Sequence, residues 1–274
     1  MPKSPRTFST SLFLRELRVE AKGLLLWTLS LGALIFWGMS EYSFMGTDMG
    51  DLSSFMEAMP RVLLAVFGFS DLDLSTAQGY HGILMNYVVL GGVIYAAMLG
   101  SRLVAKEELG KTSEFLLVKP RSRKNLLATK LLAGMLLLLL LSLILYGISR
   151  YTLWFYVPEA QVTRILSIES LGLFLLMLLY LALGIFSASA LKKPRQAQGL
   201  TLGAVFFAYA LSVFTDLLEE PGLLRLLTPL RYFPMAEVVD TAKLPLLYAL
   251  LTLIFAGALL ALAFKTYTQR DMSI

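Results

Sequence analysis

One tripeptide of this 274-residue chain, Gly110-Lys111-Thr112, has the residue types that bind a nucleotide phosphate. A phosphate-binding loop of the form GxxxxGK[ST] also needs a glycine five residues before Gly110, and it follows a buried strand. Position 105 is Ala105, and an uncharged apolar run precedes it. The chain therefore cannot bind ATP through this motif, and we predict that it is not an enzyme.

Two adjacent carboxylates, Glu107 and Glu108, have the chemistry of metal ligands, as in an intramembrane protease. Such a site needs further His or carboxylate ligands, and the topology derived below places the only histidine, His81, at the opposite face as an interfacial polar residue. Ser187 and Ser189 have no His or Lys at membrane depth to activate them. Cysteine is absent, which excludes thiolate chemistry and disulfides. We predict no catalytic residue, metal or cofactor in this chain.

The elements that position these residues are six apolar runs without a single Asp, Glu, Lys or Arg. A chain that is 57% hydrophobic and 16% charged lies outside the range of soluble domains. About 20 apolar residues suffice for a helix to cross a bilayer. We therefore predict an all-α polytopic membrane protein with one transmembrane domain over residues 1–274. The predicted spans are approximately 23–40, 82–101, 131–149, 170–191, 198–215 and 244–264.

The distribution of basic residues predicts the orientation. They concentrate before the first run, between the second and third, between the fourth and fifth, and after the sixth. With six crossings these segments share one side, which the positive-inside rule assigns to the cytoplasm together with both termini. The net charge of +5 follows from this topology and requires no nucleic acid partner.

The segment before the first run has an amphipathic pattern. We predict that it forms a helix lying in the headgroup layer; the alternative is that it only supplies positive charge. The apolar face would consist of Phe13, Leu14, Leu17 and Ala21, and the basic face of Arg15, Arg18 and Lys22.

Two loops on the opposite side contain apolar stretches. Residues 62–68, between the first two runs, are too few to cross the membrane; they form either a short surface helix or a plain connector. Residues 216–243, between the last two runs, are long and partly apolar. Such a segment can enter the outer leaflet only where protein covers its backbone.

The charged segment Arg102–Lys130, the island, lies between the second and third runs. Its middle predicts a short helix with an apolar face formed by Phe115, Leu116, Leu117 and Val118. An apolar helix face in a cytoplasmic segment needs a protein partner to cover it. The island is therefore the predicted docking site for such a partner. Packing of this helix against its own bundle is the alternative.

The ends of that short helix follow from local chemistry. Thr112 or Ser113 can cap its first turn, where Glu114 interacts favourably with the helix dipole. Pro120 ends it, because the residue before a proline is disfavoured in a helix. Ser122 can cap the next helix, which continues into the third span.

The island resembles the cytoplasmic loop of bacterial ABC transporter permeases of the second exporter class, the ABC-2 type membrane proteins. The similarity extends to residues 227–233 in the last outer loop and to Arg270-Asp271 near the C-terminus. Lys111 departs from the glycine that often precedes the threonine in this family. The resemblance is carried by Glu107-Glu108-x-x-Lys111-Thr112-x-Glu114-Phe115-Leu116-Leu117-x-Lys119-Pro120-x-Ser122-Arg123.

This resemblance implies a multi-pass protein of the bacterial cell membrane that works as a dimer, with itself or with a related permease. Each subunit would bind a separate cytoplasmic ABC ATPase, which holds ATP and Mg, and the short helix would act as a coupling helix. The ATPase-coupling residues implied in this way are Glu107, Glu108, Thr112, Glu114, Phe115, Leu116, Leu117, Pro120 and Arg123.

Two hypotheses follow for the function. The first is the permease subunit of an ATP-driven exporter that works by alternating access. The resemblance places its substrate route at the dimer interface, with spans one, two and five involved. The second is a membrane sensor, assembly factor or immunity protein that binds another cytosolic protein through residues 102–130. Co-purification of an ATPase separates the two. Uncharged spans disfavour a proton- or sodium-coupled carrier and favour an apolar or amphiphilic cargo, with an ion left open.

Overall fold

The computed structural model describes residues 10–44, 58–69, 72–109, 122–156, 160–191, 193–218 and 222–269. These ranges contain helices and turns and no strand. The helices are α1 (Thr10–Phe44), α3 (Arg61–Phe67), α4 (Ala77–Leu109), α6 (Arg123–Trp154), α7 (Ala160–Ala190), α8 (Pro194–Asp216), the 3-10 helices η1 (Gly222–Leu227) and η2 (Pro229–Arg231), α9 (Met235–Thr241) and α10 (Leu246–Gln269).

Six helices of the described ranges are long and apolar enough to span a membrane: α1, α4, α6, α7, α8 and α10. They confirm the predicted all-α polytopic fold, and each of them overlaps one of the six apolar runs. The last span begins at Leu246, two residues later than predicted, because Leu244 precedes Pro245 and is disfavoured in a helix. The Pro245 carbonyl instead accepts the Ala249 N–H at 3.0 Å, which starts the helix.

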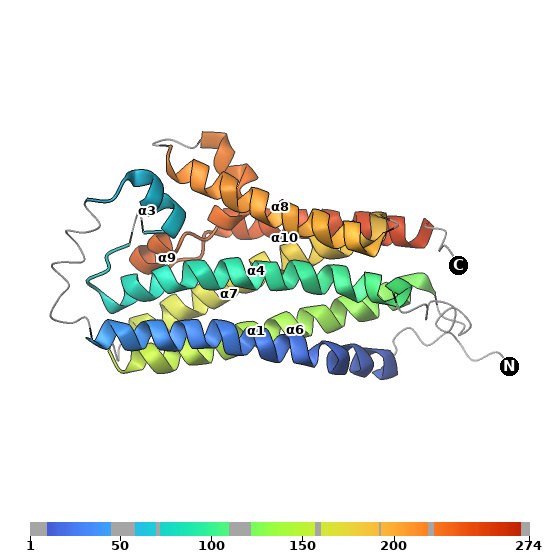
Figure 1. Cartoon of the computed structure of the whole chain (residues 1–274), viewed down its shortest axis with the longest axis horizontal. Helices are drawn as coiled ribbons and strands as arrows, with labels where there is room; N and C mark the ends of the chain where they lie inside the picture. Colours follow the sequence, from blue (N-terminus) through green and yellow to red (C-terminus); the bar gives the residue numbers. More distant parts are fainter. Residues whose placement is uncertain are drawn as a thin grey trace.

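The spans form two layers along a common long axis (Figure 1). One layer contains α1, α4 and α8, and the other contains α6, α7 and α10. The helix termini at Thr10, Leu109, Arg123 and Gln269 lie together at one end of the bundle, the island end. The opposite end, the far end, carries α3 and α9.

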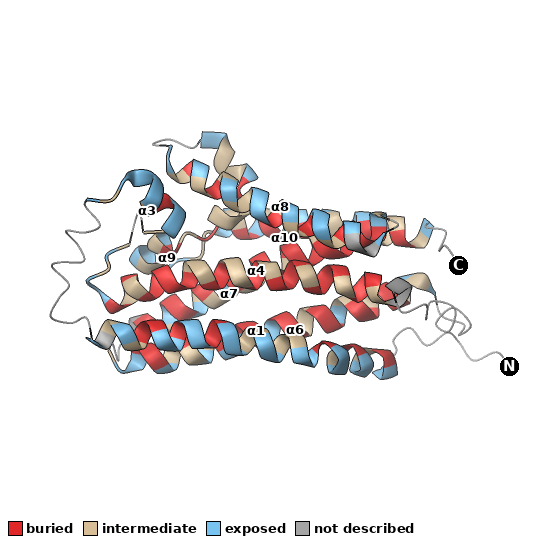
Figure 2. Cartoon of the chain, viewed as in Figure 1, coloured by how far each residue is buried: buried red, intermediate tan, exposed pale blue. Residues whose placement is uncertain are grey.

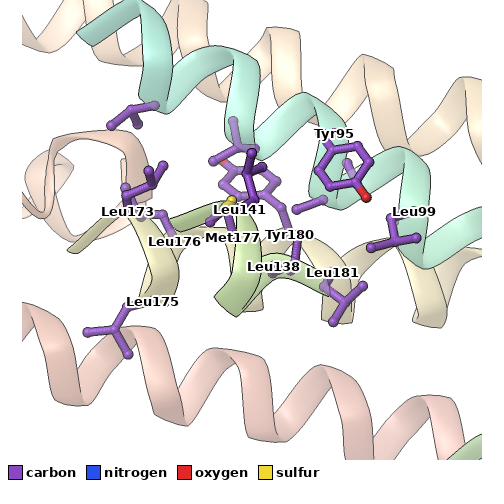
Figure 3. Packing of buried hydrophobic residues seen from close by; sticks show 14 of the residues in the cluster. Tyr95, Leu99, Leu138, Leu141, Leu173, Leu175, Leu176, Met177, Tyr180 and Leu181 are labelled. Atoms are coloured by element: carbon purple, nitrogen blue, oxygen red, sulfur yellow. The ribbon is translucent and has the colours of Figure 1, made fainter. Parts of the chain in front are cut away.

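The centre of the bundle is the pair α4 and α7, which are buried along most of their length, whereas α1, α8 and α10 expose most of theirs (Figure 2). Leucine and tyrosine side chains from α4, α6 and α7 fill the space between these helices (Figure 3). Two glycines allow the backbones to touch. A Cβ atom on Gly100 would collide with the Leu181 carbonyl oxygen, and one on Gly184 with the Ala97 carbonyl oxygen. Close backbone approach of this kind replaces the hydrophobic effect as the source of helix association in lipid.

Helix α1 differs from the prediction for the N-terminal segment. Residues 10–22 are the first turns of one continuous 35-residue helix, and no break separates them from the span. At 1.5 Å per residue α1 is about 52 Å long, well beyond the roughly 30 Å of a hydrocarbon core. The segment contains no proline or glycine before Gly23, and its carboxylates are fixed to α4, as described below.

The far end contains two structured connections. Residues 61–67 form α3, so the first loop holds a short helix rather than a plain connector. In the last loop, Tyr232 and Phe233 are buried, and Tyr232 stacks on Tyr248 of α10 with ring centroids 5.1 Å apart. Phe233 packs against Gly172 of α7. Protein therefore covers this part of the loop, which is the condition for a segment at membrane depth.

Candidate functional site

The island joins the bundle through the last turns of α4 and the first turns of α6, side by side at the island end (Figure 1). Glu107 and Glu108 belong to the last turn of α4, and Arg123 is the first residue of α6. The side chains of Glu107 and Glu108 lie outside the described part of the chain, as do the predicted coupling residues Thr112, Glu114, Phe115, Leu116, Leu117 and Pro120. What the structure adds is the set of contacts that hold the two ends of the island.

Four charged side chains tie the last turns of α4 to the first turns of α1. Lys106 Nζ contacts Glu16 Oε2 and lies 3.5 Å from Glu20 Oε1. Arg102 Nη2 lies 3.3 Å from Glu20 Oε2. On each helix the two residues are four positions apart and so share one face. The result is a ladder of ion pairs between two helices that run in opposite directions.

The carboxylates of this charge ladder are buried in the bundle. The ladder is formed by Glu16, Glu20, Arg102 and Lys106. The Glu16 side chain is fully buried, and that of Glu20 is 7% exposed. A carboxylate in such a place is tolerated only when it is paired, and removing one partner costs about 3–5 kcal/mol. These pairs therefore hold the end of α4 against the start of α1.

The start of α6 is attached as well. Ser122 caps the helix as predicted, with the Asn125 N–H donating to Ser122 Oγ at 3.3 Å. Lys130 is fully buried and donates from Nζ to the Leu103 carbonyl oxygen of α4 at 2.5 Å. Arg123 Nη1 donates to the Thr268 carbonyl oxygen of α10 at 3.5 Å. The two ends of the island thus connect four of the six spans: α1, α4, α6 and α10.

Two members of this site, Glu16 and Glu20, were missed in the sequence. Their spacing shows that they share a face, but the predicted faces of that segment were defined by apolar and basic residues only. Their partners lie more than 80 positions away, and no local pattern reveals such a contact. The basic residues Arg102 and Lys106 were assigned to the island for their charge alone.

The far half of the bundle contains a second buried polar pair. His81 Nδ1 of α4 lies 3.5 Å from Glu169 Oε2 of α7, and both side chains are 1% exposed. This corrects the prediction of an interfacial His81, because the residue faces α7 inside the bundle. Within the described ranges no three His, Cys, Asp or Glu side chains come together as a metal site, so the pair remains a contact between two helices.

The comparison with protein families decides the identity of the chain. The profile of the ABC-2 family transporter proteins matches residues 12–272, which contain all six spans except the first two residues of α1, together with the charge ladder and the island. The chain belongs to the ABC-2 family. Among curated proteins, none matches it. As an ABC-2 protein it is a membrane permease of an ABC transporter, and ABC-2 permeases work with an ABC ATPase.

The energy of an ABC transporter comes from ATP, and the chain carries no nucleotide-binding motif. In the described structure, the end of α4 is tied to α1 by the charge ladder, and the start of α6 is tied to α4 by Lys130.

Proposed function

We propose that this ABC-2 permease exports an apolar or amphiphilic cargo across the bacterial cell membrane, driven by a separate cytoplasmic ATPase that docks on the island. The ATPase holds the ATP and Mg, and the apolar face of residues 115–118 seats in its surface. Two permease subunits, identical or related, form the transporter, with the island end and both termini in the cytoplasm.

The observation that carries this proposal is the linkage of the island to four helices. A docking segment that only anchored a partner would need no buried contacts behind it. Here Lys106 pairs with a fully buried Glu16 of α1, and Lys130 reaches the backbone of α4. Closure of the ATPase would move the ends of α4 and α6, and these contacts would transmit the movement to α1 and α10. Alternating access requires several spans to move together, and this linkage would allow four of them to do so.

The test is substitution on the apolar face of the island. Leu117→Asp places a carboxylate where the ATPase is expected to bury a leucine, and Leu117→Met is the matched control that keeps an apolar side chain. An interface anchor contributes about 2 kcal/mol or more, so Leu117→Asp should weaken ATPase co-purification roughly thirtyfold. Leu117→Met should retain it, and both variants should insert normally.

Coupling is measured in proteoliposomes that contain the permease and its ATPase. The probe is a fluorescent NBD-phospholipid, whose ATP-dependent movement between leaflets is compared with ATP hydrolysis. We expect Glu114→Ala to leave hydrolysis in place and to reduce lipid movement per ATP. Wild-type coupling in Glu114→Ala together with wild-type ATPase binding by Leu117→Asp would refute the island as the docking site.

A further inference from the structure

The short helix α3 at the far end is held in an unusual way. The last four carbonyls of a helix have no partner within the helix and must be satisfied elsewhere. In α3 the first two of these have local backbone donors: the Phe69 N–H donates to the Leu64 carbonyl at 2.9 Å, and the Gly68 N–H to the Ala65 carbonyl at 3.3 Å. Gly68 adopts a φ of 72°, the left-handed conformation common at helix ends.

The next three carbonyls, of residues 66, 67 and 68, are satisfied by side chains of two spans. Two tyrosines and an asparagine supply the donors, and they come from α4 and α8. The bonds run from Tyr209 Oη to the Val66 carbonyl at 2.7 Å, from Tyr87 Oη to the Phe67 carbonyl at 3.0 Å, and from Asn86 Nδ2 to the Gly68 carbonyl at 3.2 Å.

Within the described residues, α3 has few buried contacts besides these three bonds. Ala65 is its only buried residue. Most of its larger apolar side chains are partly exposed, with Val62 at 54% and Phe67 at 43% of their surface. An element with so few buried apolar contacts belongs to the low-stability end of a structure, where local opening costs least.

A cavity lies beneath α3. It has a volume of about 50 Å³ and is lined by residues of α3, α4 and α8 and by Leu230 and Arg231. Ser212 and Val89 line it from α8 and α4. That volume is enough for a few water molecules, since one needs roughly 10–15 Å³. At the far end a small void thus lies between α4 and α8, and α3 forms part of its wall together with the three donor residues Asn86, Tyr87 and Tyr209.

We propose that α3 is a detachable plug over the crevice between α4 and α8, and that Asn86, Tyr87 and Tyr209 form its latch. In the closed state shown here, the three latch side chains bind the end of α3. When α4 and α8 move relative to each other, the donors on the two helices can no longer reach consecutive carbonyls, and α3 leaves the crevice. The inference rests on the proposed function and on the cargo route along spans one, two and five that the family resemblance implies, because α4 and α8 are spans two and five.

The experiment uses the absence of cysteine in the chain. Ser212→Cys places a single thiol at the cavity, where the native side chain is 4% exposed. Its reaction rate with MTSET, a small water-soluble thiol reagent added from the far side, reports how often the plug is open. Tyr87→Phe and Tyr209→Phe each remove one latch bond with almost no change of shape. We expect each to raise the rate about fivefold, the effect of one typical hydrogen bond on an opening equilibrium.

Two controls separate plug opening from general loosening. Tyr151→Phe alters an exposed tyrosine of α6 whose hydroxyl makes no hydrogen bond within the described residues, and it should leave the rate unchanged. Ser189→Cys places the thiol at a buried site of α7, 1% exposed, and it should stay unreactive in every latch variant. An unchanged rate at position 212 in both latch variants would overturn the plug, and so would an equal rise at position 189.

A second arm distinguishes the plug from the function on which it rests. With the partner ATPase and ATP, MTSET labelling of Ser212→Cys should also rise when the latch is intact. If the latch variants raise labelling and ATP does not, the plug stands and ATP-driven opening fails. If ATP raises labelling and the latch variants do not, the proposed function stands and α3 is not the plug.

Discussion

Lys106→Met is the most direct probe of the charge ladder between α1 and α4. The substitution removes the cation that contacts Glu16 and lies 3.5 Å from Glu20, and it keeps an apolar stem of similar length. Glu16 is then left fully buried, with Arg15 at 3.8 Å as its nearest remaining cation. That arginine is about half exposed and so compensates little.

The expected magnitude follows from this geometry. Breaking a buried ion pair by removing one partner costs about 3–5 kcal/mol. Lys106 is 19% exposed, and Arg15 offers some compensation, so a loss near the lower limit, about 3 kcal/mol, is expected. The double variant Glu16→Gln/Lys106→Met removes both charges, and such replacements are often close to neutral. We expect it to cost less than about 1 kcal/mol, so that the second substitution restores stability.

The assay is a double-mutant cycle on the free energy of unfolding of the purified permease, followed by helicity during titration of mixed micelles with SDS. The four proteins are the wild type, the two single variants and the double variant. A coupling energy of about 2 kcal/mol or more between the two sites is expected. Independent effects, with a coupling below about 0.5 kcal/mol, would refute the view that α1 and α4 are joined through this pair.

Three further outcomes can be measured on the same purified protein. Gly100→Ala should destabilise the bundle by about 1–3 kcal/mol because its Cβ meets backbone of α7, whereas Gly147→Ala, with open space around it, should be neutral or stabilising in SDS titration. Ser122→Ala should cost about 1 kcal/mol by removing the cap of α6, and Ser122→Asp should preserve it. Asp73 accepts two hydrogen bonds from Ser75, and these bonds lower the pKa of its carboxyl group. Their contribution to stability is therefore present above the ordinary pKa of about 3.9 and is lost as the pH falls through the lowered pKa. In thermal melts, the melting temperature of Asp73→Asn should fall less between pH 6 and pH 3 than that of the wild type.

The sequence was a good guide wherever the membrane itself imposes the structure. Hydrocarbon tolerates no unpaired backbone group, so each uncharged run of about 20 residues has one outcome, a helix. Local chemistry was equally readable at Ser122, whose side chain caps α6. The short apolar stretch at 62–68 was correctly recognised as too short to cross, and one of its two readings, a surface helix, is the one observed.

The parts that could not be predicted are contacts between distant residues. His81 stands near the start of an apolar run, where polar residues usually face the interface, and only the arrangement of α4 against α7 shows that it meets Glu169. Glu16 lies among basic residues that indicated a charged surface, yet its partner on α4 allows it to be buried. In both places a pairing across helices changes the environment of a side chain, and no property of the neighbouring residues records it.

One feature of α4 links the two ends of the permease. This helix runs unbroken from Ala77 to Leu109 without a proline, and it carries latch residues at one end and ladder residues at the other. Asn86 and Lys106 are about 30 Å apart along it. A straight, continuous helix of this kind can transmit a displacement from one end to the other as a rigid body, without rearrangement of side chains between them. Under the proposed mechanism, the displacement at the far end is set by the tilt or slide applied at the island end. A substitution that bends α4 midway would then separate the movement of the latch from that of the charge ladder while leaving both sets of contacts intact.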